Sequence, residues 1–306
     1  MHIHKQPSEA FVNLANALRS FVRIDQVPDA RAISMFLYNR LKQRNSWLIW
    51  MVADDSAVLK WLNIVAFGLT VLVNGLAGST TLLGGKLTAE ISDANPTLIT
   101  PAGYVFSIWG IIYILLGIFV IFQALPSQKG KDYQKGIGSL FALNSLLNIG
   151  WLFLWQFGYL SLSVVLMFLI LSTLIAIYLR LNIGKSIVSL REKFAVHLPF
   201  QVYLGWITIA SIANVSVTLV SMGWDGFGIS QETWATLIVV VALLITLLVI
   251  TTRNDIAYGL VTMWAFVGIA VEQIGNQNIV TLTEISAIII AIVLAASILL
   301  TRLRHK

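Results

Sequence analysis

The chain has 306 residues, of which 58 % are hydrophobic and 11 % charged. Together with a mean hydropathy of +0.84, this composition excludes an ordinary soluble globular domain. The lack of cysteine excludes disulfides, thiol nucleophiles and thiolate metal sites, and the net charge of +6 indicates loops near anionic lipid headgroups, not a nucleic-acid surface.

Residues 1–58 are predicted to form a cytoplasmic extension with amphipathic helices. Apolar residues recur at helical spacing from Phe11 to Val22, and a second such pattern begins near Asp29 with basic residues beside it. Basic amphipathic helices favour the headgroup layer of a membrane, although a partner-binding arm is an alternative. Met51 is an alternative start of the protein, which would remove most of this segment.

Eight apolar stretches follow, each near the roughly 20 residues that a helix needs to cross a bilayer. The chain is therefore predicted to be all-α, a polytopic membrane bundle of eight transmembrane helices. When the loops alternate between the two sides, every Lys and Arg except Lys86 falls on one side, which the positive-inside rule makes cytoplasmic. Both termini are thus predicted to be cytoplasmic, in a cell (inner or plasma) membrane. The stretches are Leu59–Gly78, Pro101–Leu125, Gly136–Phe157, Tyr159–Leu181, Val196–Met222, Glu232–Thr252, Ile256–Ile274 and Val280–Thr301.

Amides and indoles inside these stretches are candidate ligand contacts. Asn74, Asn148 and Asn214 lie at hydrocarbon depth, where an amide must find a partner in the protein or in a cavity. With Trp109 and Trp151 they fall in the outer half of the predicted bundle, which indicates a pocket there. Hydrogen bonding between helices is the alternative for each asparagine.

The other tryptophans divide by depth. Trp206 and Trp264 sit deep, where an indole offers a stacking surface and its N–H needs a partner, and packing alone is expected for Trp264. Trp155, near an outer end, is assigned with five others to the interfacial aromatic belt.

Three of the apolar stretches carry motifs that resemble the tryptophan-rich sensory protein (TspO/MBR) family, bacterial relatives of the translocator protein. The second stretch reads TPAGYVFSIWGIIYILLG, the third LNIGWLFLWQFG and the fifth YLGWITIASIAN. The diproline usual after the third-stretch tryptophan is Leu152 and Phe153 here. The basic residue that completes a sterol-recognition motif is missing after Asn214, so the resemblance favours tetrapyrroles over sterols.

The resemblance covers residues 59–222, which would form a five-helix core, and leaves residues 223–306 as three additional transmembrane helices. It implies a homodimer whose pocket binds porphyrins or related hydrophobic ligands beneath the loop between the first two helices, with no cofactor required. That loop, Ser79–Thr100, is long enough to act as a lid. Its Lys86 is either a solvated loop lysine or a cation that meets an acidic group of the ligand as the lid closes. The predicted ligand-binding residues are Asn74, Lys86, Phe106, Trp109, Tyr113, Asn148, Trp151, Trp206, Ala210, Ala213 and Asn214.

The leading hypothesis is a membrane sensor or binding protein without turnover, so no catalytic or metal-binding residue is assigned. One alternative is a small-molecule transporter, although no internal repeat or broken pair of helices is visible and the stretches nearly lack ionisable residues. Another alternative is a membrane enzyme that degrades a bound porphyrin at the tryptophans. The sequence shows no carboxylate pair or metal cluster that would support such a reaction. The expected partners are the lipid bilayer and a hydrophobic small molecule, not nucleic acid.

Overall fold

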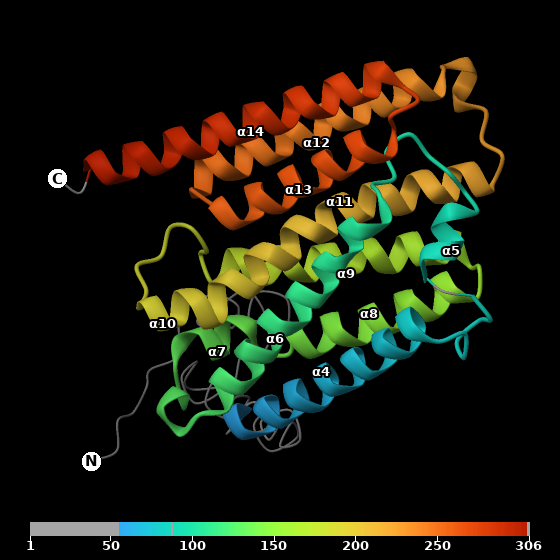
Figure 1. Cartoon of the computed structure of the whole chain (residues 1–306). Helices are drawn as coiled ribbons and strands as arrows, with labels where there is room; N and C mark the ends of the chain where they lie inside the picture. The colour runs from blue at the N-terminus through green and yellow to red at the C-terminus, as the bar shows by residue number, and fades with distance from the viewer. Residues whose placement is uncertain (1–54, 87, 305–306) are drawn as a thin grey trace, which may run out of the picture. The chain divides into compact units, whose positions relative to one another are not determined.

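The computed structural model of the chain describes residues 55–86 and 88–304, in which every regular element is a helix. The amphipathic helices predicted within residues 1–54 lie outside the described residues. From Leu59 onward, the helices below belong to one compact unit. Figure 1 shows them coloured from blue (α4) to red (α14).

Each predicted apolar stretch contains a helix. Six of the helices are long and apolar enough to cross a membrane, and two, α8 and α13, are shorter. By composition the chain is therefore a membrane helix bundle, and the all-α prediction is confirmed. The bounds are α4 Asp55–Ser79, α6 Ile108–Ala124, α8 Leu140–Gln156, α9 Leu160–Arg180, α11 Leu198–Ser221, α12 Gln231–Arg253, α13 Ile256–Glu272 and α14 Gln277–Arg304.

Short helical elements occupy the connections. The stretch predicted as Gly136–Phe157 is divided in the structure, because Gly138 has a φ of 51° and separates α7 from α8. A 3₁₀ turn, η1, leads into α6, and a π-turn, η3, leads into α11. The bounds are α5 Thr88–Asp93, η1 Gly103–Ser107, η2 Pro126–Gln128, α7 Asp132–Ile137, α10 Leu190–Glu192, η3 Lys193–His197 and η4 Gly226–Gly228.

The long helix α11 lies between two groups of helices. On one side it packs against α6 and α9, and α9 packs against α8; on the other it runs along α13, which packs with α12 and α14 (Figure 1). Gly205 permits the close approach to α13, because a Cβ there would be 3.2 Å from the Cβ of Val261 and 3.3 Å from the Cα of Tyr258. Small residues commonly allow this in membrane bundles.

Helix α4 is joined to its neighbours by polar side chains that follow one stripe of the helix. Among the six long helices it has the smallest buried share. Apolar side chains gain little from leaving lipid for protein, so interhelical hydrogen bonds carry more of the docking of such a helix. The bonds run from Asn63 Nδ2 to Gln123 Oε1 (3.0 Å), from Thr70 Oγ1 to the carbonyl of Ser145 (3.4 Å) and from Asn74 Nδ2 to Asn148 Oδ1 (2.8 Å).

Candidate functional site

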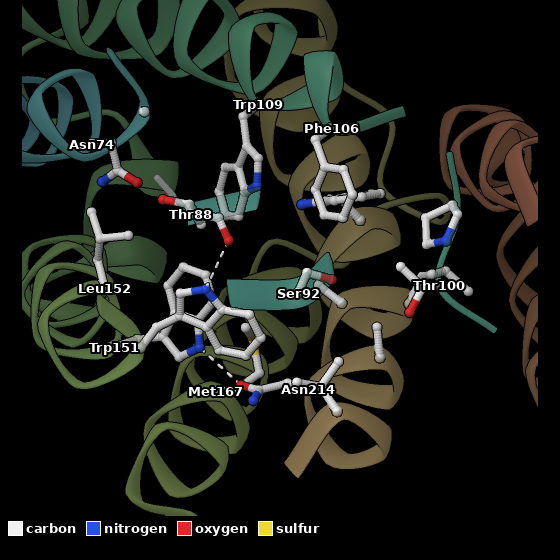
Figure 2. A pocket seen from close by; sticks show the side chains of 18 of the residues that line it. Asn74, Thr88, Ser92, Thr100, Phe106, Trp109, Trp151, Leu152, Met167 and Asn214 are labelled. Carbon is white, nitrogen blue, oxygen red and sulfur yellow. Dashed lines mark hydrogen bonds between the residues drawn. The ribbon is translucent and has the colours of Figure 1, made fainter. Parts of the chain in front are cut away.

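Aromatic side chains from η1, α6, α8 and α11 converge on one cavity of about 350 Å³. Phe106, Trp109 and Tyr113 are three or four residues apart, as are Trp151 and Trp155 on α8, so each set faces the same side of its helix. The volume falls in the range of small-molecule pockets, about 300 to 1,000 Å³. Figure 2 shows the side chains that line it. The lining residues are Asn74, Gly78, Thr88, Ser92, Thr100, Pro101, Phe106, Trp109, Tyr113, Trp151, Leu152, Trp155, Met167, Trp206, Ile209, Ala210, Ala213, Asn214 and Val217.

Four of these rings form a continuous stack along one wall. Tyr113 stacks on Trp109 with ring centroids 5.6 Å apart, Trp109 on Trp151 at 6.4 Å, and Trp151 on Trp155 at 5.8 Å. The interplanar angles lie between 19° and 28°, so the rings are nearly parallel. Trp206 meets Trp109 edge-on, with centroids 6.2 Å apart. The wall therefore offers flat π-faces of several orientations to a ligand.

Two asparagines hold this wall in place. Asn214 Oδ1 accepts a hydrogen bond from the indole N–H of Trp151 at 2.9 Å, as a dashed line in Figure 2 shows, and Asn214 Nδ2 donates to Ser163 Oγ at 3.0 Å. Asn148 is fully buried, accepts from Asn74 and donates to the hydroxyl of Tyr203 at 3.4 Å. Satisfied polar networks of this kind fix side-chain orientation in a protein interior.

Two polar atoms of the lining residues have no hydrogen-bond partner in the described part of the chain. They are the hydroxyl of Tyr113 and the indole N–H of Trp206, and both atoms are buried. A buried unpaired donor costs about 1 to 3 kcal/mol, so such groups call for a bound molecule or a water. No charged side chain of the described residues lines the cavity. An uncharged ligand surface with a hydrogen-bond acceptor therefore fits this wall best.

The loop after α4 covers the cavity and is fastened to α8. Its short helix α5 contributes Thr88 and Ser92 to the lining. Trp155 donates from its indole nitrogen to the backbone carbonyl of Thr88 at 3.1 Å, and Gln156 Nε2 donates to Thr88 Oγ1 at 3.2 Å. Gly84 allows the contact, because with a φ of 72° a Cβ would lie 2.3 Å from the carbonyl oxygen of Gln156. The segment Thr80–Thr100, here termed the lid, is thus closed at its α8 end.

The structure brings together most of the residues predicted as ligand contacts. All of them line the cavity except Asn148, which lies behind it and supports Asn74, and Lys86, which is exposed. The interfacial assignment of Trp155 is wrong, because its side chain is 5 % exposed and lines the cavity. Trp264 lies outside the lining, as expected for a packing residue.

Several lining residues were missed by the sequence patterns, and one of them left a signal. Trp155 follows Trp151 by four residues and so shares its helix face. Thr88 and Ser92 belong to α5, which has too few residues for a hydrophobic period to emerge. Met167 of α9 is apolar in an apolar helix, so nothing in its sequence context separates it from packing residues.

Comparison with known proteins gives one family. The family described as TSPO-like protein matches residues 60–300, which is more than half of the chain and includes α12, α13 and most of α14. The match therefore extends beyond residues 59–222, to which the motif resemblance was confined. No curated protein and no solved structure matches the chain.

Proposed function

Because the chain belongs to the TSPO-like protein family, a family of multi-pass membrane proteins, we propose that it binds a flat, hydrophobic, tetrapyrrole-like ligand in the cavity beneath the lid. The observation that carries the proposal is the stack of Tyr113, Trp109, Trp151 and Trp155 along a wall without charged residues among those described. A planar aromatic ligand gains stacking energy on such rings. Binding without turnover agrees with a role as a sensor.

Substitution of the stacked indoles tests the proposal. With Trp109→Leu or Trp151→Leu, we expect protoporphyrin binding to weaken by about 1 to 3 kcal/mol, the cost of losing one stacking partner. Leucine suits a membrane helix, and in the second variant Asn214 keeps its bond to Ser163. The measurement is a fluorescence and visible-absorbance titration of the detergent-purified protein.

The matched control is Trp61→Leu, because Trp61 lies on α4, is 63 % exposed and does not line the cavity. We expect the control to bind as the unsubstituted chain does. Equal affinity in all three variants would return Trp109 and Trp151 to a packing role and contradict the proposed site.

The proposed orientation has both chain ends and the loop between α9 and α11 on the cytoplasmic side. The positive-inside rule supports it, since the lid carries the external lysine, Lys86, and the cytoplasmic loop carries Lys185, Arg191 and Lys193. Because the chain lacks cysteine, labelling by a thiol reagent can occur only at a single introduced cysteine, and it shows on which side of the membrane that residue lies.

We expect an impermeant thiol reagent to label Leu82→Cys in intact cells and to label Ile187→Cys only after permeabilisation. Both side chains are well exposed, at 76 % and 103 %, so access to the reagent depends on the side of the membrane and not on burial. The measurement is the extent of labelling on a gel. Labelling of Ile187→Cys in intact cells would show that the orientation, and with it the alternation of eight spans, is incorrect.

A further inference from the structure

The end of the lid and the turn that follows it form hydrogen bonds with a helix more than 150 residues later in the chain. This segment, residues 97–105, contributes Thr100 and Pro101 to the cavity lining. Its partner is α13, one of the C-terminal helices, together with Gln273, which follows the last residue of α13. Irregular backbone in a membrane protein needs such partners, because lipid supplies none.

Gln273 binds the end of the lid. Its Nε2 donates to the backbone carbonyl of Thr97 at 3.1 Å and lies 3.5 Å from that of Thr100. Its own backbone N–H donates to the carbonyl of Ile269 at 2.9 Å, so the side chain projects from a position fixed by the helix. The amide therefore connects the rigid end of α13 to the lid.

A second set of contacts joins α13 to η1. The carbonyl of Gly268 accepts a hydrogen bond from the backbone N–H of Ala102 at 3.0 Å, and the indole of Trp264, one turn earlier, donates to the carbonyl of Val105 at 3.3 Å. The ring of Trp264 also meets Tyr104 edge-on, with centroids 5.2 Å apart. Trp264 and Gly268 share one face of α13, as their spacing of four requires.

We propose that α13 supports the ligand-binding site from outside its lining, by fixing the C-terminal end of the lid over the cavity with Gln273 as the positioning residue. The inference rests on the proposed function, because it takes a ligand to enter and leave the cavity past the lid. The other end of the lid is bonded to α8 through Thr88. Loss of the Gln273 bonds therefore loosens residues 97–100, while the bonds of Ala102, Val105 and Thr88 remain.

Dissociation of protoporphyrin tests the proposal in the purified full chain. With Gln273→Leu, which removes both donor contacts, we expect dissociation to become about three- to tenfold faster, as the loss of one or two ordinary hydrogen bonds implies. Gln273→Glu is nearly isosteric and also lacks the N–H groups, so it should accelerate dissociation at least as much at neutral pH. Stopped-flow tryptophan fluorescence measures the rates.

The matched control is Gln277→Leu. Gln277 is an exposed glutamine at the start of α14 whose amide bonds to Thr281 on its own helix. The control variant carries the same Gln-to-Leu change close to the C-terminal end of α13, at a side chain whose bond is to its own helix and not to the lid. We expect its dissociation rate to equal that of the unsubstituted chain, which separates the bonds to the lid from a general effect of losing a polar side chain.

A second readout does not depend on any ligand. Hydrogen–deuterium exchange of the backbone amides in residues 97–105 should rise in Gln273→Leu and Gln273→Glu and stay unchanged in Gln277→Leu. Unchanged exchange in the two Gln273 variants would overturn the proposal that Gln273 positions the lid, whatever the porphyrin kinetics. If the unsubstituted chain does not bind protoporphyrin, the proposed ligand class fails, and the exchange of the lid amides still decides whether α13 positions the lid.

Discussion

Replacing Asp255 with alanine is expected to lower the free energy of unfolding by about 3 kcal/mol, from a lost helix cap of about 1 kcal/mol and a buried hydroxyl left unpaired at about 1 to 3 kcal/mol. Asp255 lies in the turn between α12 and α13 and is fully buried. Its carboxylate accepts from the Tyr178 hydroxyl at 2.7 Å and from the backbone N–H of Tyr258 at 3.0 Å. Equilibrium unfolding in mixed detergent micelles measures the change.

The matched control is Asp225→Ala. Asp225 also accepts from a backbone N–H, that of Phe227 at 3.0 Å, but its side chain is exposed. The same substitution there removes a cap without leaving a buried hydroxyl, so we expect a loss of at most about 1 kcal/mol. Equal losses in the two variants would contradict the view that burial makes Asp255 critical.

The stability conferred by Asp255 should also depend on pH. Burial raises the pKa of this carboxyl above its ordinary value of 3.8, against the opposing effect of hydrogen bonds from Tyr258, Tyr178 and Gln201. The folded state then binds the proton more tightly than the unfolded state, so the free energy of unfolding falls as pH rises from about 4 through the folded pKa. Acidification from neutral pH toward 4 should therefore stabilise the unsubstituted chain relative to Asp255→Asn, which does not titrate. The opposite sign would show that the hydrogen bonds outweigh burial.

Gly268→Ala is expected to lower the free energy of unfolding by about 1 to 3 kcal/mol, the usual cost of overpacking a filled interior. A Cβ at Gly268 would lie 2.1 Å from Val105 Cγ2 and 3.2 Å from Pro101 Cβ. Val105 is fully buried and β-branched, so its methyl group cannot rotate away freely. Because Pro101 and the neighbouring Phe106 line the cavity, ligand affinity should fall as well.

A second substitution, which removes the clashing methyl group of Val105, tests the steric explanation. In Val105→Ala/Gly268→Ala the clashing methyl group is absent, so the double variant should be more stable than the sum of the two single changes by about 1 kcal/mol or more. Gly110→Ala is the control, since a Cβ at Gly110 on α6 meets nothing within 4 Å. Strict additivity of the two single changes would rule out the steric explanation.

The positions of the helices followed from the sequence because a membrane span has a simple physical signature. A run of about 20 apolar residues is typical of a membrane span, and basic residues marked every second loop. The ends of the shorter helices were less predictable. The break at Gly138 depends on a positive φ, and the π-turn before α11 begins at Lys193, outside the predicted stretch. Neither leaves a hydrophobic period to detect.

The cavity was predictable where its residues were polar or aromatic within a span. Asn74, Trp109 and Asn214 stood out because lipid makes an unpaired amide or indole costly. Lys86 was chosen for its charge and its place in the lid, and neither says which way an exposed loop side chain points. The role of α13 could not be predicted from the sequence either, because Gln273 and Gly268 act through contacts with backbone more than 150 residues away. Those contacts depend on how helices pack, and no local pattern encodes that.

The polar stripe of α4 has a consequence for the order in which the protein is made. The partners of Asn63, Thr70 and Asn74 come 60, 75 and 74 residues later in the chain. At roughly 5 to 20 residues per second, synthesis of about 75 residues takes roughly 4 to 15 s. During that interval the side chains of Thr70 and Asn74 can bond only to backbone carbonyls of α4 itself, those of Ala66 and Thr70, and lipid offers no other partner. Among the described helices α4 is made first, and it is therefore fastened in two steps, to Gln123 when α6 emerges and to Ser145 and Asn148 when α8 does.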